Sequence, residues 1–303
     1  MYKRQTENGA DVIVAVGGGS TIDAAKAAGE DAGVRWVSVP TVASTDAPTS
    51  ALAVIYTEEG EFLEYRFFSH NPDLVLVDTQ LVANAPIQFL QAGIGDALAT
   101  WLEARATAAS GAETMAGGLP TQAGTALAKL SWDIIWENAL PALEAARDHL
   151  VTPALERLVE ANTLLSGLGF ESGGLAAAHA IHNGLTAAPQ THGLTHGQKV
   201  NIGSMALLVL EGAPWQELQD FVVFTTKVGL PNTLTEIGLT VDDEAELAAV
   251  AAAAAEPSDT LHNMPFTVTP ADVVDALKAI ERVSRGIRAA HGLPEPVFYT
   301  APH

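Results

Sequence analysis

The stretch Val12-Ile13-Val14-Ala15-Val16-Gly17-Gly18-Gly19-Ser20-Thr21 decides the fold of the N-terminal part of the chain. The apolar, β-branched run from Asp11 to Val16 predicts a buried strand, and the alanine-rich run from Ser20 to Gly29 predicts a helix. Backbone N–H groups at the glycine turn between them can face an anion, and the missing β-carbons let a phosphate approach closely. Because the spacing matches neither G-x-G-x-x-G nor the P-loop, a plain tight turn is an equally good interpretation.

Further strands are expected after this unit, and the polar loop Thr41 to Ser50 follows the first of them. They are Val34 to Val39, Ala51 to Tyr56, Phe62 to Phe68 and Leu74 to Val77. The second and third of these flank the short turn Thr57 to Glu61 and predict a β-hairpin.

From Pro86 to about Ile287 the character changes to long stretches rich in Ala and Leu at helical spacing. We therefore predict an α/β domain over residues 1–86 and a helical domain over residues 87–303. The run Ala248 to Ala255 is interpreted as an alanine-rich helix that ends at Pro257.

Composition bounds the class of protein. With 303 residues, 48% of them apolar, the chain is long enough for one large or two ordinary domains with a sizeable core. The start, from Lys3 to Asn8, has no apolar stretch typical of a signal peptide, and no run approaches the roughly 18 apolar residues of a membrane span. We expect a soluble, cytoplasmic protein.

Charge and cysteine content narrow the partners. A net charge of −21 opposes binding to nucleic acid or to an anionic membrane, although solubility or adaptation to salt also explains it. The absence of cysteine excludes disulfides, thiolate zinc sites and thiol nucleophiles. A small neutral or cationic partner is expected, and any metal must have nitrogen and oxygen ligands.

Four of the nine histidines lie close together, at His179, His182, His192 and His196. The small-residue run from Ala176 to His182 predicts a helix with residues 179 and 182 on one face, and Glu171 and Ser172 offer capping groups before it. His192 and His196 are expected in a loop that enters the next helix. One such histidine is usually an ordinary core or surface residue, whereas the cluster favours metal binding or catalysis.

Two acidic residues could complete the cluster, because a catalytic zinc without cysteine needs carboxylate or histidine ligands. Asp96, in Gly93 to Leu98, is expected at the start of an apolar helix, as either an N-cap or a ligand. Asp46, in Ser44 to Pro48, follows a buried strand where α/β proteins commonly bind ligands, but its neighbours also suit a turn.

Together these segments resemble the glycerol dehydrogenases of the iron-containing alcohol dehydrogenase superfamily, over almost the whole chain. The resemblance rests on Val16 to Gly19, Pro40 to Pro48, Gly93 to Trp101, Phe170 to Leu175 with His179 and His182, His196-Gly197, and His262 to Pro265. It implies a dehydroquinate synthase-like architecture: a truncated Rossmann-like α/β domain with a parallel sheet and a hairpin, followed by an all-α domain.

The resemblance also implies a zinc ion held by Asp96, His179 and His196 in the cleft between the domains. Fe²⁺ is less expected, although such a ligand set also accepts it. His182 would lie behind the ligands, and Asp46 would hydrogen-bond a substrate hydroxyl. Asp46, Asp96 and His179 are thus the expected catalytic residues.

The implied cofactor is NAD. The family's dinucleotide contacts carry over onto Gly18, Gly19, Asp23, Thr41, Ser44, Ser50, Leu52 and Tyr56. The metal would acidify a substrate hydroxyl, and hydride would pass from the adjacent carbon to nicotinamide, so that glycerol becomes dihydroxyacetone. A vicinal diol, which can chelate the ion, would be preferred, with Phe170 as a wall of the pocket. A homo-oligomer, an octamer in the family, is expected.

The chain departs from the family in two places. Family members have a further N-terminal stretch about two βαβ units long. It includes an acidic residue that binds the adenosine ribose. Without it, the strand at residues 11–16 is expected to expose a hydrophobic edge prone to aggregation. In addition, Ser20 replaces the usual lysine. Because both departures affect the cofactor site and spare the metal site, a catalytically impaired metal-binding remnant is the alternative hypothesis.

Overall fold

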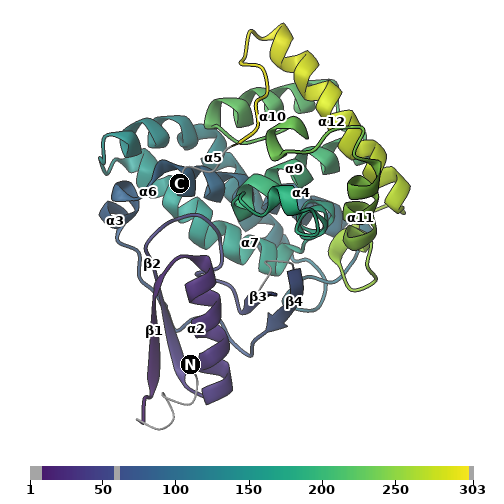
Figure 1. Cartoon of the computed structure of the whole chain (residues 1–303). Helices are drawn as coiled ribbons and strands as arrows, with labels where there is room; N and C mark the ends of the chain where they lie inside the picture. Colours follow the sequence, from purple (N-terminus) through teal and green to yellow (C-terminus); the bar gives the residue numbers. More distant parts are fainter. Residues whose placement is uncertain (1–8, 58–61, 300–303) are drawn as a thin grey trace.

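The computed structural model describes residues 9–57 and 62–299, so most of the turn expected at residues 57–61 lies outside the described residues. An α/β part at the N-terminal end of the chain carries a larger helical part, as Figure 1 shows. This is the predicted succession of an α/β region and a helical region.

The α/β part contains a parallel sheet in the order β1 (Val12–Gly17), β2 (Arg35–Pro40), β5 (Leu74–Val75). Helix α2 (Gly19–Ala32) joins β1 to β2 and ends at Gly33, whose φ of 63° favours glycine. The predicted strand, glycine turn and helix are therefore confirmed. The last strand is shorter than predicted, although the Leu76 amide still donates to Ser38 O at 2.8 Å.

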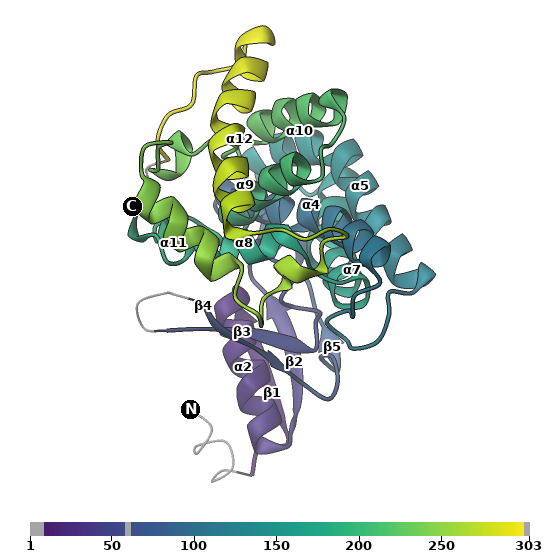
Figure 2. The same ribbon diagram turned by 90° about the vertical axis from the view of Figure 1, so that its right-hand side faces the viewer.

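The predicted hairpin is also confirmed, as the antiparallel pair β3 (Leu52–Tyr56) and β4 (Phe62–Phe67). Seen in Figure 2, it lies at the junction between the sheet and the helical part. The Asn183 side chain donates to Tyr65 Oη at 2.9 Å, which ties the hairpin to a helix. The hairpin thereby closes one side of the junction.

The helical part begins after Pro86, and no strand occurs within its described residues, 87–299. Its α-helices are α4 (Ile87–Ser110), α5 (Gln122–Arg147), α6 (Pro153–Glu160), α7 (Ser166–Gly173), α8 (Ala177–Leu185), α9 (His196–Leu210), α10 (Trp215–Val228), α11 (Glu244–Ala254) and α12 (Pro270–Ala290). Short 3₁₀ turns lie at Pro189–Thr191, Thr235–Ile237 and Thr260–Asn263.

Helix α4 is the centre of this part, because it packs against α5, α7 and α9 and most of its residues are buried. The large hydrophobic core of the chain surrounds it. A π-helical turn, η1 (Ala161–Leu165), joins α6 to α7 and was not predicted. None of the described helices combines the length and the low polarity needed to cross a membrane.

The division at residues 86 and 87 stays a prediction. Pro86 separates two helices, but the preceding helix, α3 (Thr79–Asn84), was not predicted and packs on α5 and α6. The alanine-rich helix before Pro257 is confirmed as α11.

One face of the parallel sheet is apolar and uncovered. Ala15 packs on Ile22 and Ala25 of α2, so the alternating residues Val14 and Val16 point to the opposite face, where they are 56% and 58% exposed. Leu74 and Leu76 are exposed as well. Parallel sheets normally bury both faces, and within the described residues β1 pairs on one side only. The expected hydrophobic edge is therefore present.

A lysine on this face should reduce self-association. We expect Val14→Lys to lower the apparent mass and the light scattering of concentrated protein, because edge lysines block strand pairing. The cost in stability should stay below about 1 kcal/mol, since the side chain is already exposed. Sedimentation velocity measures the effect.

Leu119→Lys provides the control, because it adds the same charge at an exposed residue outside the sheet. An equal change in both variants would show that net charge, and not the sheet face, governs association.

Candidate active site

Glycines on α4 bring three segments into van der Waals contact. A β-carbon on Gly93 would overlap Ala43 O, in the loop after β2, and one on Gly95 would overlap Gly197 O, at the start of α9. A β-carbon on Gly197 would in turn overlap the carbonyl oxygen of Ala92. These close approaches place Asp96, the next residue of α4, between the loop and α9.

Asp96, His179 and His196 come together at this point, as the resemblance implied. Asp96 Oδ1 lies 3.0 Å from His196 Nε2 and 3.3 Å from His179 Nε2. One possible ligand atom from each residue lies within 4.8 Å of the other two. The three side chains converge from α4, α8 and α9, and this nitrogen and oxygen donor set fits zinc or Fe²⁺.

The electrostatics of the cluster follow from its burial. Burial opposes ionisation of Asp96, but the imidazoles of His196 and His179 hold the pKa of this carboxyl well below its usual value. Burial likewise opposes a charge on His179, yet Glu103 and Asp96 raise the pKa of its ring well above the ordinary range. Asp96 and His179 therefore favour the charged form of one another.

Asp96 does not begin a helix, contrary to our expectation. It lies within α4, which starts at Ile87, and its Oδ2 accepts the backbone N–H of Asp46 at 3.2 Å. The capping interpretation was therefore wrong, because Pro86 and not a polar residue precedes the helix, and Asp96 lies about two and a half turns after its start.

The capping role expected of Glu171 and Ser172 was also wrong. Both belong to the preceding helix α7, and α8 starts after Ala176, which provides no side-chain cap. Glu171 instead accepts the Ala51 amide at 2.9 Å and the Asn71 side chain at 2.7 Å. It links the helical part to the hairpin.

The Asp46 carboxyl lies beside the cluster. Its Oδ2 accepts from Ser166 Oγ at 2.7 Å, so its side chain stabilises a long-range contact and not the local turn. Burial and the negative charge of Asp96 raise the pKa of Asp46 well above its ordinary value. Its position next to Asp96 suits a group that binds a substrate hydroxyl.

His182 and His192, the other two histidines of this stretch of sequence, have different surroundings. The ring of His182 lies 4.2 Å from that of His196, centroid to centroid, and burial lowers its pKa well below the ordinary value. His182 is thus behind the ligands, where the resemblance implied it. His192, by contrast, is bound to Thr186 O at 2.8 Å and takes no part in the cluster.

A single cavity joins the cluster to the glycine turn. Its lining includes many of the expected site residues: Gly19, Asp23, Asp46, Ser50, Leu52, Tyr56, Phe170, His179 and His196. Of the expected dinucleotide contacts, Gly18, Thr41 and Ser44 do not line it. Helix α2 begins at the cavity with no side-chain cap and no acidic residue in its first turn, which suits a phosphate group.

Sequence analysis missed several residues of this region. Tyr65 and Asn183 line the cavity, and their contact was not visible because the hairpin and α8 are far apart in the chain. Lys26 is fully buried, and its Nζ contacts Asp23 Oδ1 at 2.9 Å and Ala47 O at 2.7 Å. Its position one helical turn after Asp23 was an available signal.

A parallel sheet with a glycine turn, joined by one cavity to an Asp–His–His cluster that could hold a metal, is typical of an oxidoreductase with a Rossmann-like α/β domain. Comparisons with known proteins agree. The family model of iron-containing alcohol dehydrogenases matches residues 1–79. The solved structure of glycerol dehydrogenase from Schizosaccharomyces pombe superposes with a TM-score of 0.95 at 40% identity, covering 99% of this chain and 77% of that one.

Two relatives are similar over most of the chain. A glycerol dehydrogenase from Escherichia coli is 54% identical over 88% of this chain and 72% of the relative. A glycolaldehyde reductase from Halobacterium salinarum is 51% identical over 93% of this chain and 77% of the relative. The chain belongs to the iron-containing alcohol dehydrogenase family, in its glycerol dehydrogenase branch.

The close approach at Gly95 is open to a direct test. We expect Gly95→Ala to weaken zinc binding and to lower the melting temperature, because the new methyl group forces α4 and α9 apart at the residues that carry Asp96 and His196. Zinc titration and calorimetry measure the two effects.

Gly286→Ala is the matched control, since it lies exposed within α12 and a β-carbon there meets no atom within 4 Å. It should stabilise the protein by about 0.5–1 kcal/mol, through the higher helix propensity of alanine. Unchanged zinc binding in Gly95→Ala would contradict our account of the site's geometry.

Proposed function

We propose that the protein is an NAD-dependent dehydrogenase that converts glycerol, or a related vicinal diol, to dihydroxyacetone or the matching hydroxyketone. The observation that supports this most strongly is that Asp46, two expected metal ligands and several expected dinucleotide contacts line one cavity. The glycerol dehydrogenase relatives provide the substrate class.

The glycolaldehyde reductase relative supports the same chemistry in the reverse direction. Reduction of glycolaldehyde gives a vicinal diol, as reduction of dihydroxyacetone does. The shared feature of the two reactions is an oxygen on the carbon next to the reacting one. We therefore propose recognition of that second oxygen as the basis of specificity.

We assign the following roles to residues of this chain in that reaction. A zinc ion held by Asp96, His179 and His196 would supply a Lewis acid that lowers the pKa of a substrate hydroxyl. NAD would supply the nicotinamide that accepts the hydride. Asp46 is held by Ser166 through Oδ2, which leaves Oδ1 to accept a hydrogen bond from a hydroxyl in the cavity.

Other residues would shape the cavity for this task. Leu52, Phe170 and Leu175 form one apolar cluster along its wall, which helps to exclude water from the reacting atoms. Lys26 holds the segment that carries Ser50 and Leu52, because its ammonium group donates to Ala47 O and Leu52 O, at 2.7 and 2.5 Å. The cavity thus has a fixed wall on the expected cofactor side.

The alternative is a metal-binding remnant that does not turn over and that keeps the cluster of Asp96, His179 and His196. A cytoplasmic homo-oligomer is expected under either hypothesis.

Turnover separates the two hypotheses. We expect the zinc-loaded protein to reduce NAD with glycerol at alkaline pH, and Asp96→Ala and His196→Ala to abolish detectable turnover, because each removes a ligand of the Lewis acid. Steady-state absorbance of NADH measures the rate. Stoichiometric zinc without turnover in the unmodified protein would favour the remnant.

Substrate choice tests the role of the second oxygen. We expect kcat/KM for 1,2-propanediol to exceed that for 2-propanol by about tenfold or more, the effect of one additional hydrogen bond or ligand. Asp46→Asn should lower kcat/KM for 1,2-propanediol more than kcat/KM for 2-propanol, so that the ratio between the two falls. Equal efficiency with both alcohols would contradict recognition of the second oxygen.

A further inference from the structure

Glu103 is a fully buried acid that sequence analysis did not single out. It lies on α4 about two turns after Asp96, on the same face of the helix, and its side chain is 0% exposed. Burial of a carboxylate requires strong compensating hydrogen bonds. Those bonds all come from the segment that carries His179.

The first compensation is a helix cap. Glu103 Oε1 accepts the backbone N–H groups of Ala176 at 2.8 Å and of His179 at 2.9 Å. Helix α8 has no cap of its own, because its N-cap residue is Ala176. A carboxylate at a helix N-terminus satisfies free N–H groups and interacts favourably with the helix dipole. Glu103 therefore fixes where α8 begins relative to α4.

The second compensation is to the imidazole of His179. Glu103 Oε2 lies 2.5 Å from Nδ1 of this ring. An ionised carboxylate only accepts hydrogen bonds, so the proton of the neutral ring belongs on Nδ1. The Nε2 lone pair then faces the metal site, where Asp96 Oδ1 is 3.3 Å away. Carboxylates in this position orient metal-binding histidines and raise their basicity.

His196 is positioned by a different device. It begins α9 directly after Thr195, whose side chain forms a reciprocal capping box with Gln198. Its side chain is 22% exposed, and no carboxylate within the described residues contacts its Nδ1. The orientation of His179 is thus the one that depends on a buried charge.

We propose that Glu103 is a positioning residue for the metal centre: it holds the backbone and the ring of His179 together, so that Nε2 is presented to the ion. The inference rests on the metal site of the proposed function but not on the identity of the substrate. Helix α4 thus carries both Asp96, an expected metal ligand, and Glu103, which positions the second expected ligand, His179.

The test is Glu103→Gln, measured by zinc competition with a chromophoric chelator. The amide oxygen can still accept the two backbone N–H groups, whereas the amide nitrogen would donate to Nδ1 and favour the ring tautomer with its proton on Nε2. We expect zinc affinity to fall about 10- to 100-fold. The zinc-free protein should still fold, because the helix cap is kept.

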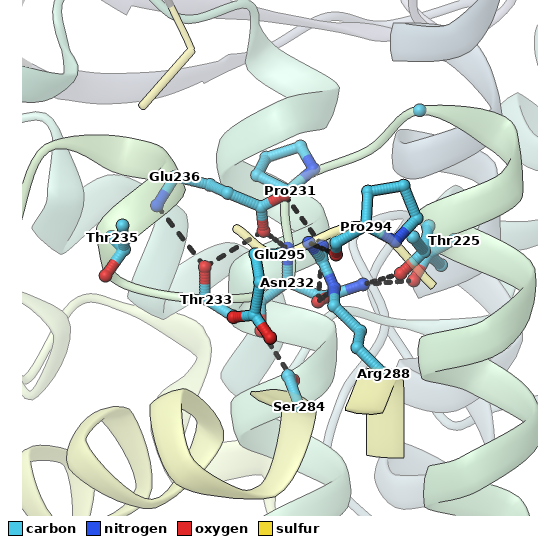
Figure 3. Close-up of polar contacts among 12 residues, drawn as sticks. Thr225, Pro231, Asn232, Thr233, Thr235, Glu236, Ser284, Arg288, Pro294 and Glu295 are labelled. Carbon is cyan, nitrogen blue, oxygen red and sulfur yellow. Dashed lines mark hydrogen bonds and ion pairs between the residues drawn. The ribbon is translucent and has the colours of Figure 1, made fainter. Parts of the chain in front are cut away.

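Glu236→Gln is the matched control. Glu236 is likewise a buried carboxylate, which accepts from the Asn232 amide at 2.9 Å and pairs with Arg288 at 2.7 Å (Figure 3). It contacts none of the expected metal ligands. We expect this variant to lose stability, because Arg288 is left buried without its partner, while its zinc affinity stays within twofold of the unmodified protein.

The outcomes are distinct. Zinc affinity that is unchanged in Glu103→Gln, with or without a lower melting temperature, would reduce Glu103 to a helix cap and overturn the proposal. If this variant does not fold, the ¹⁵N spectrum of the zinc-loaded unmodified protein decides instead, because coordination of His179 through Nδ1 would equally overturn it.

A failure of the proposed function looks different. Zinc bound without turnover would reject the dehydrogenase but leave the affinity comparison intact. A chain that binds no zinc at all would overturn both the function and the role of Glu103.

Discussion

The close approach between α4 and its two neighbouring segments is the constraint on which the site depends. Gly93 admits the loop after β2, and Gly95 together with Gly197 admits the start of α9. A β-carbon at any of these glycines would overlap the facing carbonyl oxygen and push the segments apart. Because Asp96 follows directly, the same packing that buries the helix also brings its carboxylate to His196 and to the Asp46 amide. Fold and site share one cause.

The buried charges of the site cost free energy unless they are paired. Asp46, Asp96 and Glu103 are three carboxylates with little or no exposure, in a chain whose net charge is already −21. The histidines offset part of this charge, while burial and the charge of Asp96 raise the pKa of Asp46. A divalent cation between Asp96, His179 and His196 is the natural compensation, since a buried charge persists when it is paired or coordinates a metal. The acidic composition therefore agrees with a cation site.

Most of the fold could be predicted from local sequence patterns, whereas contacts between residues far apart in the chain could not. The strand, glycine turn and helix at residues 12–32 follow from β-branched and alanine runs, and the hairpin follows from two apolar segments around a polar turn. Glu103 and Asn183 have no such signal, because their partners are 76 and 118 residues away in the chain. The wrong capping role of Asp96 has the same origin: glycines before an acid resemble a helix start, whereas here they serve close packing within a long helix.

The two halves of the proposed chemistry rest on different parts of the fold. The metal ligands and Glu103 all belong to helices packed around one large core, and the α/β part contacts this cluster through the loop after β2. The cofactor side depends on α2 and the loop held by Lys26, which rest on a sheet whose other face is exposed. A parallel sheet with one exposed apolar face opens more easily than a packed helical core. We therefore expect metal binding to survive conditions that disrupt the proposed cofactor side.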